Sequence, residues 1–165
     1  MIPVVSVIGW HNVGKTALIE ELVRILRSRG FRVAVIKHTR GDFQLDREGT
    51  DTWRFAQAGA DVVVISGKQQ VAFIENRVRE ARLEEIVERL PQSIDIVITE
   101  GFKRERTLKI EVLRSWEERI TSDSEALALV CPNGGIREQT IVPCFSPEEV
   151  AQVAELIVEK FGLGR

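Results

Sequence analysis

A glycine-rich loop near the start of the chain has the residue types needed to hold a chain of phosphates. Residues 9–16 are Gly-Trp-His-Asn-Val-Gly-Lys-Thr, which match the phosphate-loop pattern G-x-x-x-x-G-K-[ST] at every fixed position. Gly9 allows a sharp turn, and Gly14 allows backbone N–H groups to approach phosphate oxygens closely. We expect Lys15 to reach the β- and γ-phosphates and the Thr16 hydroxyl to be a ligand of Mg²⁺. The loop therefore predicts a site for a nucleoside triphosphate.

The segments on both sides of this loop predict the elements that must position it. The apolar residues 4–8 indicate a buried strand, and residues 15–29 have apolar side chains at helical spacing. The variable positions between the fixed ones complete the predicted nucleotide-binding segment: Trp10, His11, Asn12 and Val13. His11 or Asn12 either touches a phosphate or the attacking water, or only shapes the loop.

The rest of the chain alternates apolar runs with helical patterns, which predicts an α/β fold. We expect one P-loop nucleotide-binding domain over residues 1–165, with a P-loop NTPase-like three-layer fold. A mainly parallel sheet would carry helices on both faces and a β-hairpin extension. The expected strands are residues 4–8, 32–39, 60–66, 70–75, 95–99, 109–113 and 126–130, and the hairpin joins 60–66 to 70–75. The expected helices are residues 15–29, 52–58, 83–90 and a last one that begins at Pro147, inside a Ser146–Glu149 capping box, and stops at Gly162.

Carboxylates near the predicted strand ends are candidates for the metal site. Open α/β sheets bind ligands beyond the carboxyl ends of their strands. Glu100 ends an apolar strand, where an ionised carboxylate is costly unless it is paired or near a metal. In the polar loop 40–51, Asp46 is the first candidate for Mg²⁺ or its water, and Asp42 is the second.

The same rule selects further places at strand ends. These are the tip Ser66–Gly67, the residues Lys37, His38 and Thr39, and the loop 131–135, in which Asn133 is placed to reach a base. Lys103, Arg104 and Arg106 follow Glu100 and either hold a second anion or form an ordinary charged turn.

Composition limits the class of protein. The chain has 23 Lys and Arg against 25 Asp and Glu, a net charge of −2, which argues against a general nucleic-acid binder. No apolar stretch is long enough to span a bilayer, and the first residues lack the features of a signal peptide, so we expect a cytoplasmic protein. Cys131 and Cys144 match neither a zinc nor a redox spacing and are expected to be buried.

The order of the motifs resembles a known family. The phosphate loop, residues 36–39, Asp46, residues 99–103 and residues 109–111 together look like the molybdopterin-guanine dinucleotide biosynthesis adaptor family, MobB. The similarity spans nearly the whole chain. Related loops often have small residues between Trp10 and Gly14, where this chain has His-Asn-Val, a difference that bears on hydrolysis.

This resemblance implies a cytoplasmic, dimeric GTP-binding protein with weak hydrolysis. It would assist the separate MobA-like nucleotidyltransferase that attaches GMP to molybdopterin, and would help to deliver cofactor to molybdoenzymes. It also implies that residues 9–16 hold the GTP phosphates, with Asp46 and Glu100 around Mg²⁺. Edge strands near residues 70–75 and 109–113 are compatible with a homodimer.

The residues themselves do not determine which nucleotide base is bound or which reaction, if any, is catalysed. The chain lacks the guanine-reading Asn-Lys-x-Asp motif, a Gln-bearing switch and an assignable arginine finger, so slow turnover fits better than fast. One alternative is a small-molecule P-loop kinase with a lid around Arg77, Arg79 and Arg82. Another is a metallochaperone NTPase, which requires a Cys/His metal cluster.

Overall fold

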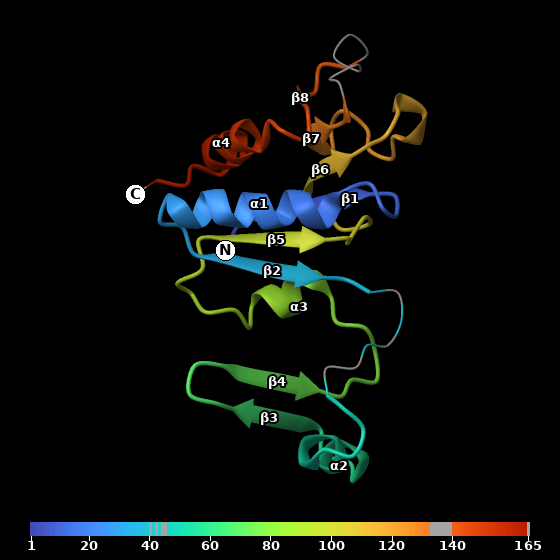
Figure 1. Cartoon of the computed structure of the whole chain (residues 1–165), viewed down its shortest axis with the longest axis vertical. Helices are drawn as coiled ribbons and strands as arrows, with labels where there is room; N and C mark the ends of the chain where they lie inside the picture. Colours follow the sequence, from blue (N-terminus) through green and yellow to red (C-terminus); the bar gives the residue numbers. More distant parts are fainter. Residues whose placement is uncertain (40, 42, 44–45, 133–139, 165) are drawn as a thin grey trace. The chain divides into compact units, whose positions relative to one another are not determined.

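The computed structural model describes residues 1–165 apart from residues 40, 42, 44–45, 133–139 and 165. The chain divides into two compact units, of which unit 1 comprises Met1–His38 and Val87–Arg165 and unit 2 comprises Thr39–Ile86 (Figure 1). Among the described residues, no helix combines the length and the apolar character needed to cross a membrane. The organisation of both units as a single domain stays a prediction.

Unit 1 is built on a six-stranded sheet with the strand order β2-β5-β1-β6-β7-β8. All neighbouring pairs in it are parallel. The strands are β1 (Val4–Gly9), β2 (Val33–Lys37), β5 (Ile96–Glu100), β6 (Leu108–Val112), β7 (Ala126–Val130) and β8 (Cys144–Phe145). The predicted α/β fold with a mainly parallel sheet is confirmed. The expectation that residues 109–113 form an edge strand is wrong, because β6 lies between β1 and β7.

Two helices cover one face of this sheet. Helices α1 (Lys15–Ser28) and α4 (Val150–Phe161) lie next to each other (Figure 1). Their apolar side chains recur at i, i+4 spacing, as in Leu18, Leu22 and Leu26 of α1, and pack on alternate residues of the inner strands. The strand residues in this core include Val5, Val7, Ile96, Ile98, Ile110, Val112, Ala128 and Val130.

The opposite face of the same strands buries polar side chains. Ser6, Thr99 and Glu111 are fully buried, and Lys109 is 4% exposed. The hydroxyl of Thr99 donates to that of Ser6 at 2.9 Å, and Ser6 in turn lies 2.6 Å from the hydroxyl of Thr107. A smaller apolar cluster on β7 and β8 contains both free cysteines, Cys131 and Cys144, which are buried as expected.

The last helix begins later than its capping pattern predicted. α4 starts at Val150, and residues 147–148 form a turn ahead of it, so Pro147 is not the first helical residue. The Glu149 carboxylate does accept the N–H of Ser146 at 2.7 Å, so the Glu half of the capping box is present. Gly162 ends the helix in the left-handed conformation, as predicted. The short strand β8 and the 3₁₀ helix η1 (Trp116–Glu118) were not predicted.

Unit 2 contains a helix and a two-stranded antiparallel sheet. Helix α2 (Asp51–Gln57) is capped by Thr50, and β3 (Val62–Ser66) pairs with β4 (Val71–Glu75), which confirms the hairpin. Ser66 ends β3 and Gly67 opens the turn to the antiparallel β4, so the rule for parallel strand ends does not apply to this tip. Helix α3 (Leu83–Val87) lies at the boundary of the units and is shorter than predicted, because a turn closed by Leu90 N–H and Val87 C=O follows it.

Candidate phosphate-binding site

The phosphate loop leaves the carboxyl end of β1 in a turn that only glycine fits at its first position. Gly9 has φ of 146°, and a Cβ there would lie 2.4 Å from the carbonyl oxygen of Val112. Asn12 and Gly14 also have positive φ, at 57° and 96°. A Cβ on Gly14 would meet open space, so the reason for glycine at this position is its backbone conformation.

The amides of this loop are available to an anion. In the part of the chain that the structure describes, no carbonyl accepts a hydrogen bond from the N–H groups of residues 12–16. The first bond of α1 runs from Leu18 N–H to Gly14 C=O at 3.0 Å. Unpaired N–H groups and the positive end of the helix macrodipole both attract phosphate oxygens. The loop therefore has the geometry of an anion-binding nest.

Lys15 is the first residue of α1, and its side chain reaches back across the loop. Its ammonium donates to the carbonyl of Trp10 at 2.6 Å. A lysine is a point charge on a flexible four-carbon stem, so the same side chain is able to exchange this carbonyl for phosphate oxygens. Trp10 is half exposed, and its indole N–H donates to the carbonyl of Glu118 at 2.8 Å.

Thr16 and Glu100 bring oxygen atoms together beside the loop. The Thr16 hydroxyl lies 3.5 Å from both carboxylate oxygens of Glu100, which ends β5 next to β1 in the sheet. The ammonium of Lys37, at the end of β2, lies 3.7 Å from the same carboxylate. A hydroxyl and a carboxylate are the hard oxygen ligands that Mg²⁺ prefers, directly or through water. These two residues fit the predicted magnesium site.

Asp46 belongs to unit 2 and has partners there. Its carboxylate accepts hydrogen bonds from the hydroxyls of Thr52 and Thr50, the latter at 2.8 Å, and from the N–H of Arg47. These bonds, led by the one from Thr52, lower the pKa of Asp46 below its ordinary value. The structure thus shows this carboxylate at the start of α2, and its metal role stays a prediction. Asp42 and Asn133 lie outside the described residues.

The motif segments at the ends of β2 and β5 pack against each other. The rings of His38 and Phe102 are 4.8 Å apart, and a Cβ on Gly101 would lie 3.2 Å from the Cβ of His38. Gly101 and Phe102 both have positive φ, at 99° and 54°, so the chain turns sharply right after Glu100. Next in the chain, the Lys103 ammonium lies 5.2 Å from the centre of the Trp10 ring. Of the polar segments selected by sequence, those at the ends of β2 and β5 thus lie beside the phosphate loop.

The arginines suggested for a kinase lid are held by one carboxylate. Within unit 2, Arg77, Arg79 and Arg82 lie 2.9, 2.5 and 3.5 Å from Glu85. The hydrogen bond from Arg79 is the largest cause that lowers the pKa of Glu85 to about 2. In the described ranges, no group of at least three His, Cys, Asp and Glu side chains is placed to hold a metal ion.

Sequence reasoning missed the partners that the phosphate loop has in the connection between β6 and β7. The carbonyl of Glu118 accepts from Trp10, and the Arg114 guanidinium lies 3.5 Å from the carbonyl of His11. Backbone carbonyls leave no mark in a sequence, and Glu118 is 108 positions away from Trp10. The 3₁₀ helix that presents this carbonyl spans only Trp116–Glu118.

Comparison with known proteins shows the family to which a chain with this loop and sheet belongs. The family model of molybdopterin guanine dinucleotide synthesis protein B, MobB, matches residues 4–132, which include the phosphate loop, Glu100 and β6. The chain belongs to this family. The crystal structure of MobB from Bacillus subtilis has the same fold, with a TM-score of 0.76 and 27% identity over 94% of this chain and 98% of the other.

Curated relatives of this MobB family member are bacterial and archaeal. The molybdopterin-guanine dinucleotide biosynthesis adapter protein of Haemophilus influenzae is 34% identical over 66% of this chain and 62% of its own length. A putative adapter protein of Methanocaldococcus jannaschii is 44% identical over 61% of this chain and 41% of its own length. The chain therefore matches less than two thirds of the length of either relative.

Proposed function

We propose that this MobB family member is a GTP-binding adapter in the synthesis of molybdopterin guanine dinucleotide. The observation that supports nucleotide binding best is the loop at residues 9–16, whose N–H groups at residues 12–16 donate to no carbonyl in the described structure. The adapter role and the guanine base come from the family, because this chain has no guanine-reading motif of its own. The proposal includes the cytoplasmic location that the family resemblance implies.

In this proposal, different residues of the loop bind different parts of the nucleotide. The amides of Trp10, His11, Asn12, Val13 and Gly14 surround the phosphates, and Lys15 exchanges the Trp10 carbonyl for β- and γ-phosphate oxygens. Thr16 and Glu100 hold Mg²⁺ directly or through water, and Asp46 is a further candidate. The metal, when bound, neutralises part of the phosphate charge. Hydrolysis is slow, because no glutamine switch or arginine finger is assigned.

A direct binding titration tests the nucleotide part. We expect GTP with Mg²⁺ to bind the wild-type chain and to outcompete ATP, and Lys15→Ala to weaken GTP by more than tenfold because a charge-assisted contact is lost. Circular dichroism should show an intact fold in this variant. Equal GTP affinity in the wild-type and Lys15→Ala chains would refute the site.

The magnesium part has its own test. Glu100→Gln keeps the shape of the side chain but removes its charge, so we expect GTP affinity to lose most of its dependence on Mg²⁺. Asp61→Asn is a matched control that also removes only a charge, because Asp61 is an exposed acid of unit 2. An unchanged Mg²⁺ dependence in Glu100→Gln would remove Glu100 from the metal site.

The adapter part predicts a partner. Adding the chain with GTP to the nucleotidyltransferase and molybdopterin should raise the yield of molybdopterin guanine dinucleotide, and Lys15→Ala should not raise it. A yield that does not depend on the chain would contradict the adapter role while leaving nucleotide binding in place. Delivery of the product to molybdoenzymes is a later step that the same family relation suggests.

The apolar side of the hairpin supports a homodimer. Val62, Val64, Val71 and Phe73 lie on one face of β3 and β4, and they are 48–71% exposed. Contiguous exposed apolar side chains on a short sheet mark an interaction surface, and a two-stranded sheet has a free edge on each strand. We propose that this face meets a second copy of the chain.

A further inference from the structure

Trp10 connects the phosphate loop to a distant part of the chain. Its indole N–H donates to the carbonyl of Glu118 at 2.8 Å, and its own carbonyl accepts from the ammonium of Lys15 at 2.6 Å. The lysine that is expected to bind phosphate is thus two hydrogen bonds away from η1. Arg114, just before η1, adds a 3.5 Å contact to the His11 carbonyl.

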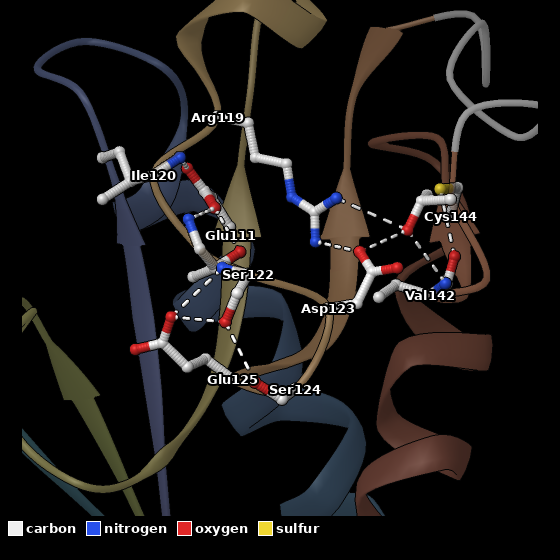
Figure 2. Close-up of polar contacts among 11 residues, drawn as sticks. Glu111, Arg119, Ile120, Ser122, Asp123, Ser124, Glu125, Val142 and Cys144 are labelled. Atoms are coloured by element: carbon white, nitrogen blue, oxygen red, sulfur yellow. Dashed lines mark hydrogen bonds and ion pairs between the residues drawn. The ribbon is translucent and has the colours of Figure 1, made fainter.

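A buried carboxylate fixes the segment that presents this carbonyl. Glu111 of β6 is fully buried and pairs in register with Ile8, the residue before Gly9. Its oxygens accept from the N–H of Ile120 at 2.6 Å, and from the N–H and hydroxyl of Thr121 at 2.8 and 2.6 Å (Figure 2). A buried carboxylate needs such donors, because it is costly to remove it from water without them.

The same segment is held from its other side. The guanidinium of Arg119 lies 2.7 Å from the carboxylate of Asp123 and contacts the Thr140 hydroxyl at 3.4 Å (Figure 2). It also lies 4.8 Å from the centre of the Trp116 ring. Glu118 therefore directly precedes three anchored residues, Arg119, Ile120 and Thr121. Its carbonyl is a fixed acceptor for Trp10.

We infer that Glu111 and Trp10 are positioning residues for nucleotide binding. Glu111 sets the place of Glu118 through Ile120 and Thr121, and the Trp10–Glu118 hydrogen bond holds the phosphate loop with its amides and Lys15 facing the ligand. This inference rests on the proposed nucleotide function of the loop. It assigns Glu111, whose hydrogen bonds in the described part of the chain run to Ile120 and Thr121, a part in the affinity of the phosphate loop.

A double-mutant cycle in GTP affinity tests this path. Trp10→Phe keeps an aromatic ring and removes the N–H donor, and Glu111→Gln keeps the shape and places an NH₂ group against backbone donors. The loss of one neutral hydrogen bond changes an equilibrium constant by roughly three- to tenfold. We expect each single variant to lower the affinity for GTP with Mg²⁺ by that factor. Because both residues act through the same contacts, the GTP affinity of the double variant should be within about twofold of that of the single variant that binds GTP more weakly.

Controls and a second readout separate positioning from general destabilisation. Glu125→Gln is the matched control, since Glu125 accepts from Ser122 in the same connection but is half exposed and beyond the anchored residues, and its GTP affinity should equal that of the wild type. Hydrogen exchange gives the second readout: GTP should slow exchange at Ile120 and Thr121 in the wild type and not in Trp10→Phe. This comparison decides the question if Glu111→Gln fails to fold.

The outcomes distinguish this inference from the proposed function. Wild-type affinity in Trp10→Phe, full additivity in the double variant, or the same exchange response in Trp10→Phe as in the wild type would each overturn the positioning role. If Lys15→Ala lowers the affinity for GTP by more than tenfold while Trp10→Phe leaves it unchanged, the phosphate site stands and only the positioning role fails. If the wild-type chain binds no triphosphate, the proposed function itself fails.

Discussion

At the scale of single residues, the phosphate loop depends on backbone conformations that few side chains tolerate. The fixed positions Gly9, Gly14, Lys15 and Thr16 were predictable from the sequence, because glycines and a Lys-Thr pair at that spacing have one well-known physical use. The Trp10–Glu118 and Glu111–Ile120 hydrogen bonds were not predictable, since each has a backbone group as one partner and forms only on folding.

Gly9→Ala tests the tightest contact of the loop. The new Cβ would lie 2.4 Å from the Val112 carbonyl oxygen at φ of 146°, so the backbone must shift. We expect a loss of about 2–5 kcal/mol in the free energy of unfolding, from strain and overpacking together. Chemical denaturation measures it.

Gly67→Ala is the matched control for this change. Its Cβ would meet the Gln70 carbonyl oxygen at an ordinary 3.6 Å. Its effect should stay within about 0.5–1 kcal/mol. Equal stability of the Gly9→Ala variant and the wild type would show that the turn is not as the structure describes it.

At the scale of elements, the parallel sheet could be predicted because its strands are apolar runs of five or six residues with helical patterns between them. The missed strand β8 has only two residues, too few to show a period. The start of α4 was placed three residues early, because Ser146 and Glu149 make one bond of a capping box around a turn instead of around the first helical turn.

Glu85 in α3 forms ion pairs with three arginines, and these pairs predict that the stability of the fold depends on pH. The pKa of Glu85 is lowered from 4.5 to about 2, first by the hydrogen bond from Arg79 and against the effect of desolvation. A carboxyl whose pKa is lower in the folded state stabilises the fold above its unfolded pKa and loses that effect as pH falls towards the folded pKa. The stabilisation is therefore complete at pH 7 and declines between about pH 4.5 and pH 2.

Thermal unfolding of Glu85→Gln measures this contribution. The variant should melt below the wild type at pH 7, and the difference should narrow as the pH falls below 4.5. Glu84→Gln, at the exposed neighbour, should melt like the wild type throughout. A difference between the Glu85→Gln variant and the wild type that is the same at pH 7 and at pH 3 would contradict the ion-pair explanation.

At the scale of the whole molecule, two units with different chemistry share one chain. Unit 1 contains the phosphate loop, Thr16 and Glu100, whereas unit 2 exposes the apolar face of a hairpin. The sequence could show that residues 60–75 form a hairpin, but alternation of apolar residues alone does not tell whether the outer face meets the same chain, a second copy or water. That face is why we expect a homodimer.

Phe73→Lys tests the homodimer. Phe73 is 71% exposed, so a lysine there should leave the folded chain intact while placing a charge in an apolar contact between copies. We expect the wild type to have the mass of a dimer at micromolar concentration in analytical ultracentrifugation, and Phe73→Lys that of a monomer. Val78→Lys, at another exposed apolar residue, should remain dimeric. A monomeric wild type would contradict this prediction.

A crystal structure of the chain with Mg²⁺ and a non-hydrolysable GTP analogue tests the central claim most directly. The phosphates should lie on the N–H groups of residues 12–16, with Lys15 moved from the Trp10 carbonyl to the β- and γ-phosphates and the metal on Thr16. A nucleotide bound elsewhere, with Lys15 still on the Trp10 carbonyl, would contradict it.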